Sequence, residues 1–273
     1  MADKPEFNGW AHAKQSVAFL AANFPSALKA SGLWLVLIVG TMAAATPVLV
    51  WLVQNDPNVA AWIRSSDERL IQLIVVLPSI LLMIIGWPSV AVAWHRFVLR
   101  REPPGFLPFS PGRGGLYLLL SITFYLMVWI APGALLAYIF YTTMKGDSSA
   151  RGLIGLVWLP LAVALFGLSM RFSLKLPAIA VSDTGMTFAR SWKETAAIWP
   201  GMMWGSIVLT LPLYMASRAL DRAAENTGED QLELAVLLGA INMVAFFTGL
   251  LLYATFLSLT YQRAVGDTST TFD

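Results

Sequence analysis

The feature that most constrains this chain is a set of long apolar runs, each close to the ~20 residues that cross the hydrocarbon core of a bilayer. Six such runs occupy residues 33–53, 70–94, 116–143, 153–170, 202–216 and 234–261. Backbone amides in lipid must be satisfied within their own segment, and the runs lack the alternating pattern of barrel strands, so each is predicted to be an α-helix. We therefore expect an all-α, polytopic membrane protein, in which residues 1–273 form a single integral membrane domain with six transmembrane helices in three hairpins.

Composition excludes a soluble domain. Charged residues make up only 12% of the chain and hydrophobic residues 57%, whereas soluble proteins carry about 25% charged residues. The chain has no cysteine, which excludes disulfides and thiolate-based metal sites or catalysis.

The loops between the runs differ in charge. Twelve lysines and arginines fall in the N-terminal arm, the second and fourth loops and the C-terminal tail, and six fall in the remaining loops. Positive charge accumulates on the cytoplasmic side of membrane proteins. The pattern therefore predicts that both termini are cytoplasmic.

Short amphipathic segments precede the first and fifth runs, at about residues 10–25 and 187–199. Apolar residues recur at helical spacing in both, namely Ala13, Val17, Leu20 and Phe24 in the first and Phe188, Trp192, Ala196 and Trp199 in the second. Pro25 and Pro200 are expected in the first turns of the membrane helices that follow, and Thr187 is expected to cap the second segment. Because both segments are short and place aromatic beside basic residues, we expect two interfacial helices on the cytoplasmic surface.

The second, fourth and sixth runs each end with an arginine: Arg96, Arg171 and Arg263. The favoured interpretation is that these side chains extend to lipid phosphates, as cations do at any cytoplasmic helix end. The alternative is that they converge on one anionic headgroup held between helices. The candidate headgroup contacts are Arg96, Arg100, Arg171, Lys175, Arg190, Lys193 and Arg263. Membrane lipids, including anionic ones, are the expected partners; a second copy of the chain or another membrane protein is a further candidate, and nucleic acid is not expected.

A longer motif begins at Arg171. Arg171, Phe172, Ser173, Leu174, Leu176 and Pro177 are followed, after a polar gap, by Arg190, Ser191, Trp192 and Thr195. This motif resembles one in the membrane domain of bacterial glycerophosphodiester phosphodiesterases and in stand-alone six-helix relatives of unknown function. It covers about a tenth of the chain, and Ala196-Ala197 stand where the family has Gly-Asn. The resemblance implies a membrane module of the bacterial inner membrane, and it supplies no activity for stand-alone members.

The motifs of common enzymes are missing. A phosphodiesterase of that family needs a separate barrel of roughly 250 residues, for which the chain has no room. His12 and His95 lack metal-ligand spacing, and each is interpreted as an interfacial polar residue rather than a ligand. The glycines of Pro111–Gly115 are interpreted as a turn into the next helix. We expect no catalytic, cofactor-binding or metal-binding residues.

Transport remains as an alternative. All six runs lack charged residues, which disfavours ion coupling because coupled transporters place ionisable groups at depth. Asn242 is the notable polar residue within a run, and we expect it to bond between helices. The leading hypothesis is a non-catalytic membrane module that organises lipid or a partner protein. The alternative is a transporter or flippase for a lipid-like or amphiphilic substrate, which requires no buried charge.

Overall fold

All regular structure among the described residues is α-helical, which confirms the predicted fold class. The computed structural model describes residues 7–106, 108–109, 111–144, 149–227 and 232–266. The helices are α1 (Gly9–Ala22), α2 (Phe24–Asn55), α3 (Pro57–Ser65), α4 (Glu68–Arg100), α5 (Pro111–Met144), α6 (Ser149–Phe172), α7 (Lys175–Ala180), α8 (Phe188–Glu194), α9 (Trp199–Glu225) and α10 (Leu232–Val265).

Each predicted apolar run lies within one of the long helices α2, α4, α5, α6, α9 and α10. Within the described parts of the chain, four helical segments are long and apolar enough to cross a membrane: Phe24–Asn55, Leu73–Arg100, Pro160–Ala180 and Val236–Val265. The pair α8 and α9, bent by 91° at the break between them, adds a fifth if it forms one span. These helices confirm transmembrane character, while six crossings remain a prediction. The third run, 116–143, is helical, but several of its side chains lie outside the described residues.

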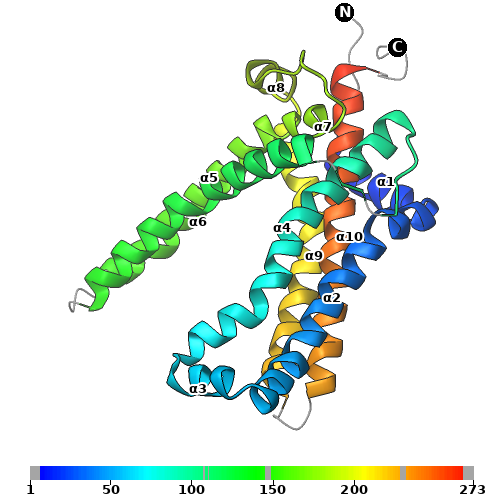
Figure 1. The fold of residues 1–273 in the computed structure, drawn as a ribbon. Helices are drawn as coiled ribbons and strands as arrows, with labels where there is room; N and C mark the ends of the chain where they lie inside the picture. Colours follow the sequence, from blue (N-terminus) through cyan, green and yellow to red (C-terminus); the bar gives the residue numbers. More distant parts are fainter. Residues whose placement is uncertain (1–6, 107, 110, 145–148, 228–231, 267–273) are drawn as a thin grey trace, which may run out of the picture.

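The long helices meet at one end and separate toward the other. Helices α2, α4, α9 and α10 form a bundle, and the paired helices α5 and α6 diverge from it (Figure 1). The short helices α1, α7 and α8 gather where the long helices meet (Figure 1). We call this region, with the described part of the loop over residues 101–109, the packed end.

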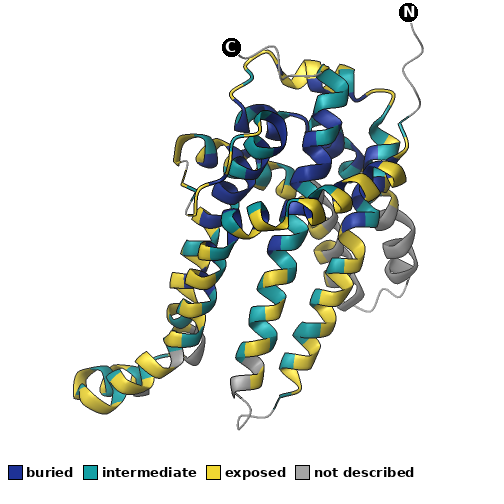
Figure 2. Cartoon of the chain, turned by 90° about the vertical axis from the view of Figure 1, so that its right-hand side faces the viewer, coloured by how far each residue is buried: buried dark blue, intermediate teal, exposed yellow. Residues whose placement is uncertain are grey.

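Burial is concentrated at the packed end (Figure 2). One core cluster includes Leu174, Met202 and Phe256, and a second includes Trp34 and Trp94. Away from this end the helices expose large apolar side chains, for example Trp51, Leu73, Leu126, Leu211 and Tyr214. Such surfaces suit a lipid solvent, in which apolar exposure costs nothing.

The first predicted interfacial segment forms α1, and its apolar stripe is divided between the protein and the surface. Ala13 and Leu20 are buried against the protein, whereas Val17 is 49% exposed and Phe24 is 61% exposed. Phe24 belongs to α2, because the helical structure is interrupted at Asn23 and Pro25 occupies the first turn of α2. The buried side of α1 is completed by small and polar residues, Gly9, His12 and Ser16, because α1 lies very close to α9.

The second interfacial segment forms the shorter helix α8. Its predicted cap is confirmed, since the Thr187 hydroxyl accepts the Arg190 amide hydrogen at 3.1 Å. The helix ends at Glu194 instead of reaching residue 199, and Trp199 opens α9 with Pro200 in the first turn.

Helix α3 was not expected from the sequence. Asp56 caps its N-terminus, since the Asp56 carboxylate accepts the amide hydrogens of Asn58 and Val59 at 2.8 and 3.4 Å, and Pro57 occupies the first turn. The helix lies between α2 and α4 at the end opposite to the packed end (Figure 1).

Candidate functional site

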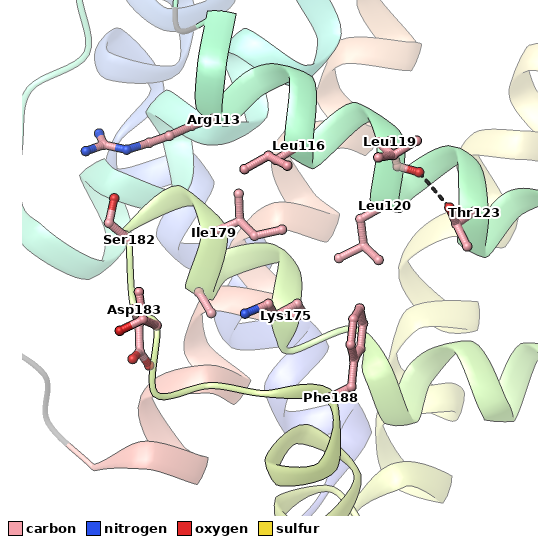
Figure 3. A pocket seen from close by; sticks show the side chains of 12 residues that line it. Arg113, Leu116, Leu119, Leu120, Thr123, Lys175, Ile179, Ser182, Asp183 and Phe188 are labelled. Atoms are coloured by element: carbon pink, nitrogen blue, oxygen red, sulfur yellow. Dashed lines mark hydrogen bonds between the residues drawn. The ribbon is translucent and has the colours of Figure 1, made fainter.

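A cavity of about 600 Å³ lies at the packed end between α5, α7 and the segment that leads into α8 (Figure 3). This volume is within the range of small-ligand pockets in proteins. Its lining comprises Arg113, Leu116, Leu119, Leu120, Thr123, Lys175, Ala178, Ile179, Ser182, Asp183, Thr184 and Phe188.

One end of this cavity is apolar. Leu116, Leu119 and Leu120 come from one face of α5, opposite Ile179 of α7 and Phe188 of α8 (Figure 3). The lining follows α5 from residue 113 to residue 123, which corresponds to roughly 15 Å at the rise of an α-helix. That length is about half of the ~30 Å thickness of a hydrocarbon core.

The other end is polar and carries two cations. Figure 3 shows Arg113 at the same end as Ser182 and Asp183, with Lys175 further in. The Lys175 ammonium donates to the Met186 carbonyl oxygen at 2.7 Å, which leaves two of its three hydrogens for a ligand. Arg113 forms no hydrogen bond or ion pair with any described residue.

Asp183, the acid among the described residues at this end, is already engaged. Asp183 accepts hydrogen bonds from the Tyr261 hydroxyl and, at 2.8 Å, from the amide of Gly185. Its carboxylate is thus held by α10 and by its own loop, away from a role as counter-ion to Arg113. The balance of charge at the polar end is positive and favours an anion.

Two predicted headgroup contacts instead fix the wall of the cavity. Arg96 donates to the carbonyl oxygen of Ala180 at 3.4 Å, and Arg100 donates to that of Val181. Both carbonyls lie at the C-terminus of α7, where cations are favoured by the helix dipole. These arginines of α4 therefore position α7, and with it Lys175, opposite α5.

The other predicted contacts are dispersed over the packed end. Lys175 is the member of the predicted set that lines the cavity. Arg190 pairs with Glu194 at 3.9 Å, Arg263 lies over the ring of Phe7, and Lys193 is exposed on α8. The structure therefore does not bring the arginines at the ends of the second, fourth and sixth runs to one point.

The residues of the recognised motif form a clasp between α6 and α8. The Arg171 guanidinium stacks on Trp192, 3.5 Å from the ring centroid, and donates to the Trp192 carbonyl oxygen at 2.7 Å. In return the hydroxyls of Ser191 and Thr195 donate to the Arg171 carbonyl oxygen at 2.8 and 3.1 Å. The motif thus holds α8, and the Phe188 wall of the cavity, against the end of α6.

The interfacial assignment of His95 is wrong, because the side chain is fully buried between three helices. Its Nδ1 lies 2.7 Å from the Ser258 hydroxyl of α10, and its Nε2 lies 3.1 Å from the Tyr117 hydroxyl of α5. A serine beside a histidine is the start of a nucleophilic site, but here both side chains are 0% exposed. The group joins α5 to the bundle.

Asn242 of α10 donates to the Asp221 carboxylate of α9 at 2.8 Å. Asp221 also accepts from Arg218 at 3.4 Å. This contact links the two helices far from the cavity.

Arg113 is the functional residue that sequence reasoning missed. It lies in the first turn of α5, within Pro111–Gly115, whose glycines had been interpreted only as a turn. The available signal was an arginine among glycines at the start of a long helix, a position whose free amides and dipole also favour anions. Comparisons of the chain with protein families, with curated proteins and with solved structures found no match.

Proposed function

We propose that this protein is a non-catalytic membrane module that binds an anionic amphiphile, a phospholipid of the cytoplasmic leaflet, in the cavity between α5 and α7. In this proposal the chain crosses the bacterial inner membrane six times in three hairpins, and both termini and the packed end face the cytoplasm.

The observation that carries the proposal is the Arg113 guanidinium, which pairs with no described residue and lies at one end of a cavity whose other end is apolar. A charge without a partner at the membrane surface gains most from a phosphate, with which arginine forms paired, charge-assisted hydrogen bonds. The leucines of α5 and Phe188 offer the adjoining apolar surface to an acyl chain. A free inorganic anion would leave that apolar surface without a ligand.

The charge pattern supports the orientation. Eleven of the twelve cations assigned to the cytoplasmic side lie between residues 14 and 113 or between 171 and 263, in segments that the structure gathers at the packed end. The cavity then opens at the depth where anionic lipids of the inner leaflet place their phosphates.

The test is native mass spectrometry of the protein extracted in a mild detergent. Wild-type protein is expected to retain a phospholipid. Arg113→Gln removes the phosphate contact, and retention of anionic lipid is expected to fall roughly tenfold, the loss typical of one charge-assisted hydrogen bond. Thr123→Trp fills the apolar end and is expected to reduce retention of every lipid.

Two controls match these variants. Lys193→Gln removes an exposed cation at the packed end outside the cavity, and Leu126→Trp adds the same ring to α5 one turn beyond Thr123. Both are expected to leave lipid retention unchanged. If wild type and Arg113→Gln retain the same lipids in the same amounts, the proposal fails.

A further inference from the structure

A second cavity, of about 290 Å³, adjoins the first at Arg113, which lines both. It lies between the last turns of α4, the loop after α4 and the first turn of α5. Its lining comprises Ser89, Val92, Ala93, Arg96, Glu102, Pro103, Pro104, Gly105, Pro108, Phe109 and Arg113. The guanidinium that is proposed to hold a phosphate therefore has an apolar cavity on one side and a polar one on the other.

The charges of this polar cavity disfavour a cationic group. Glu102 is its only described acid, and it is paired with Arg96, whose Nε donates to it at 2.7 Å. Its other carboxylate oxygen lies 3.7 Å from Arg100. Glu102 is matched by two guanidiniums, and Arg113 pairs with no described residue, so the described walls carry a net positive charge that repels an ammonium headgroup.

The same walls offer acceptors for hydroxyl groups. Pro103, Pro104 and Pro108 line the cavity, and a proline has a backbone acceptor but no amide hydrogen to donate. The Pro108 carbonyl accepts the Trp34 indole hydrogen at 3.2 Å, which fixes this side of the loop to α2. Glu102 also retains unused lone pairs, because a carboxylate accepts about four hydrogen bonds. A ligand with several hydroxyl donors fits this arrangement.

We propose that the bound amphiphile is an anionic phosphodiester lipid with a polyhydroxyl headgroup. Its phosphate binds Arg113, its acyl chain occupies the apolar cavity, and its hydroxyls occupy the polar cavity beside Glu102. This inference rests on the proposed function and adds the class of headgroup to it.

The test compares three lipids with identical acyl chains, titrated into delipidated protein in a neutral detergent and measured by native mass spectrometry. Phosphatidylglycerol carries two headgroup hydroxyls, phosphatidic acid carries none, and phosphatidylethanolamine carries an ammonium. Phosphatidylglycerol is expected to bind about threefold to tenfold more tightly than phosphatidic acid, the gain of one or two hydrogen bonds. Phosphatidylethanolamine is expected to bind most weakly.

Filling the polar cavity should remove the preference for phosphatidylglycerol over phosphatidic acid and leave the binding of phosphatidic acid unchanged. Gly105→Trp is suitable, because a Cβ at Gly105 meets no atom within 4 Å, and Ala93→Phe approaches the cavity from α4. Either is expected to lower phosphatidylglycerol binding to the level of phosphatidic acid without changing the latter. Arg113→Gln is expected to weaken both.

The outcomes separate the two proposals. If none of the three lipids binds, or if Arg113→Gln changes nothing, the proposed function fails and this inference fails with it. If anionic lipids bind through Arg113 but phosphatidic acid binds as tightly as phosphatidylglycerol, the headgroup inference fails and the proposed function stands. Persistence of the preference in both Gly105→Trp and Ala93→Phe also overturns the inference.

Discussion

Gly9 and Gly201 are in backbone contact where α1 crosses the start of α9. A Cβ built on Gly9 would lie 2.0 Å from the Gly201 carbonyl oxygen, and one on Gly205 would lie 2.6 Å from the Gly9 carbonyl oxygen. Gly201 and Gly205 form a pair four residues apart, the spacing that lets helices of membrane proteins approach closely. The contact fixes α1 across the packed end.

Gly9→Ala is therefore expected to destabilise the protein. Two backbones must separate to admit the methyl group, and overpacking of this kind costs about 1–3 kcal/mol. Thermal unfolding in detergent measures the effect. Gly40→Ala is the matched control, since a Cβ at Gly40 meets nothing within 4 Å and alanine favours a helix. Equal unfolding temperatures for Gly9→Ala and wild type would contradict the contact.

Substitution of His95 is expected to uncouple α5 from the bundle. His95→Leu leaves the buried hydroxyls of Ser258 and Tyr117 without their partner, at a cost of about 1–3 kcal/mol for each unsatisfied group. Adding Ser258→Ala to His95→Leu should cost less than Ser258→Ala alone in the wild-type background, because its partner is already lost. Thr260→Val is the control, since Thr260 is equally buried but bonds only to its own helix.

Acidification is expected to weaken the docking of α1. Burial, and to a lesser extent the Arg263 guanidinium, lower the pKa of His12 from 6.5. The unfolded chain then binds a proton more readily than the folded one, so the stability present above pH 6.5 is lost as pH falls toward the folded pKa. Unfolding temperatures of wild type and His12→Gln, compared at pH 7.5 and 5.5, test this: the variant should show the smaller drop. An identical drop in both would assign the pH dependence to other groups.

The clasp predicts that Arg171 cannot be replaced by lysine without loss. Lysine keeps the charge but loses the planar stack on Trp192 and the directed bond to the Trp192 carbonyl. We expect Arg171→Lys to loosen α8 and to speed trypsin cleavage after Arg190 and Lys193. Lys29→Arg, a change of the same kind on α2, should leave the cleavage rate as in wild type.

The apolar runs predicted the long helices correctly because lipid leaves a backbone few alternatives. Short elements were harder to predict. Helix α3 has only nine residues, too few to form a membrane span, and the clearest local signal of its start is Asp56 before Pro57. In α1 the apolar stripe was predicted, but the side that packs on the protein was not: Gly9 and Ser16 face the protein because close backbone contact needs small side chains.

For the candidate site, the sequence predicted only the side of the membrane on which it lies, and not the residues that form the cavity. Lys175 was named from its charge, but the cavity needs α5, α7 and α8, whose contributions come from residues 113 to 188. Likewise, His95 and Ser258 are 163 residues apart in the sequence, and no local sequence pattern predicts the hydrogen bond between them. The motif from Arg171 to Thr195 was recognised, yet its role as a clasp depends on the loop that returns α8 to α6.

The proposed orientation can be tested with single cysteines, because the chain has none of its own. Lys193→Cys on α8 should react with a membrane-impermeant maleimide only after cells are permeabilised. Ser65→Cys on α3 and Asn226→Cys after α9 should react in spheroplasts, since an odd number of crossings separates each from α8. All three positions are exposed, so a failure to label reflects the side of the membrane and not burial. Labelling of Lys193→Cys in intact spheroplasts would place the packed end outside and remove the cavity from the cytoplasmic leaflet.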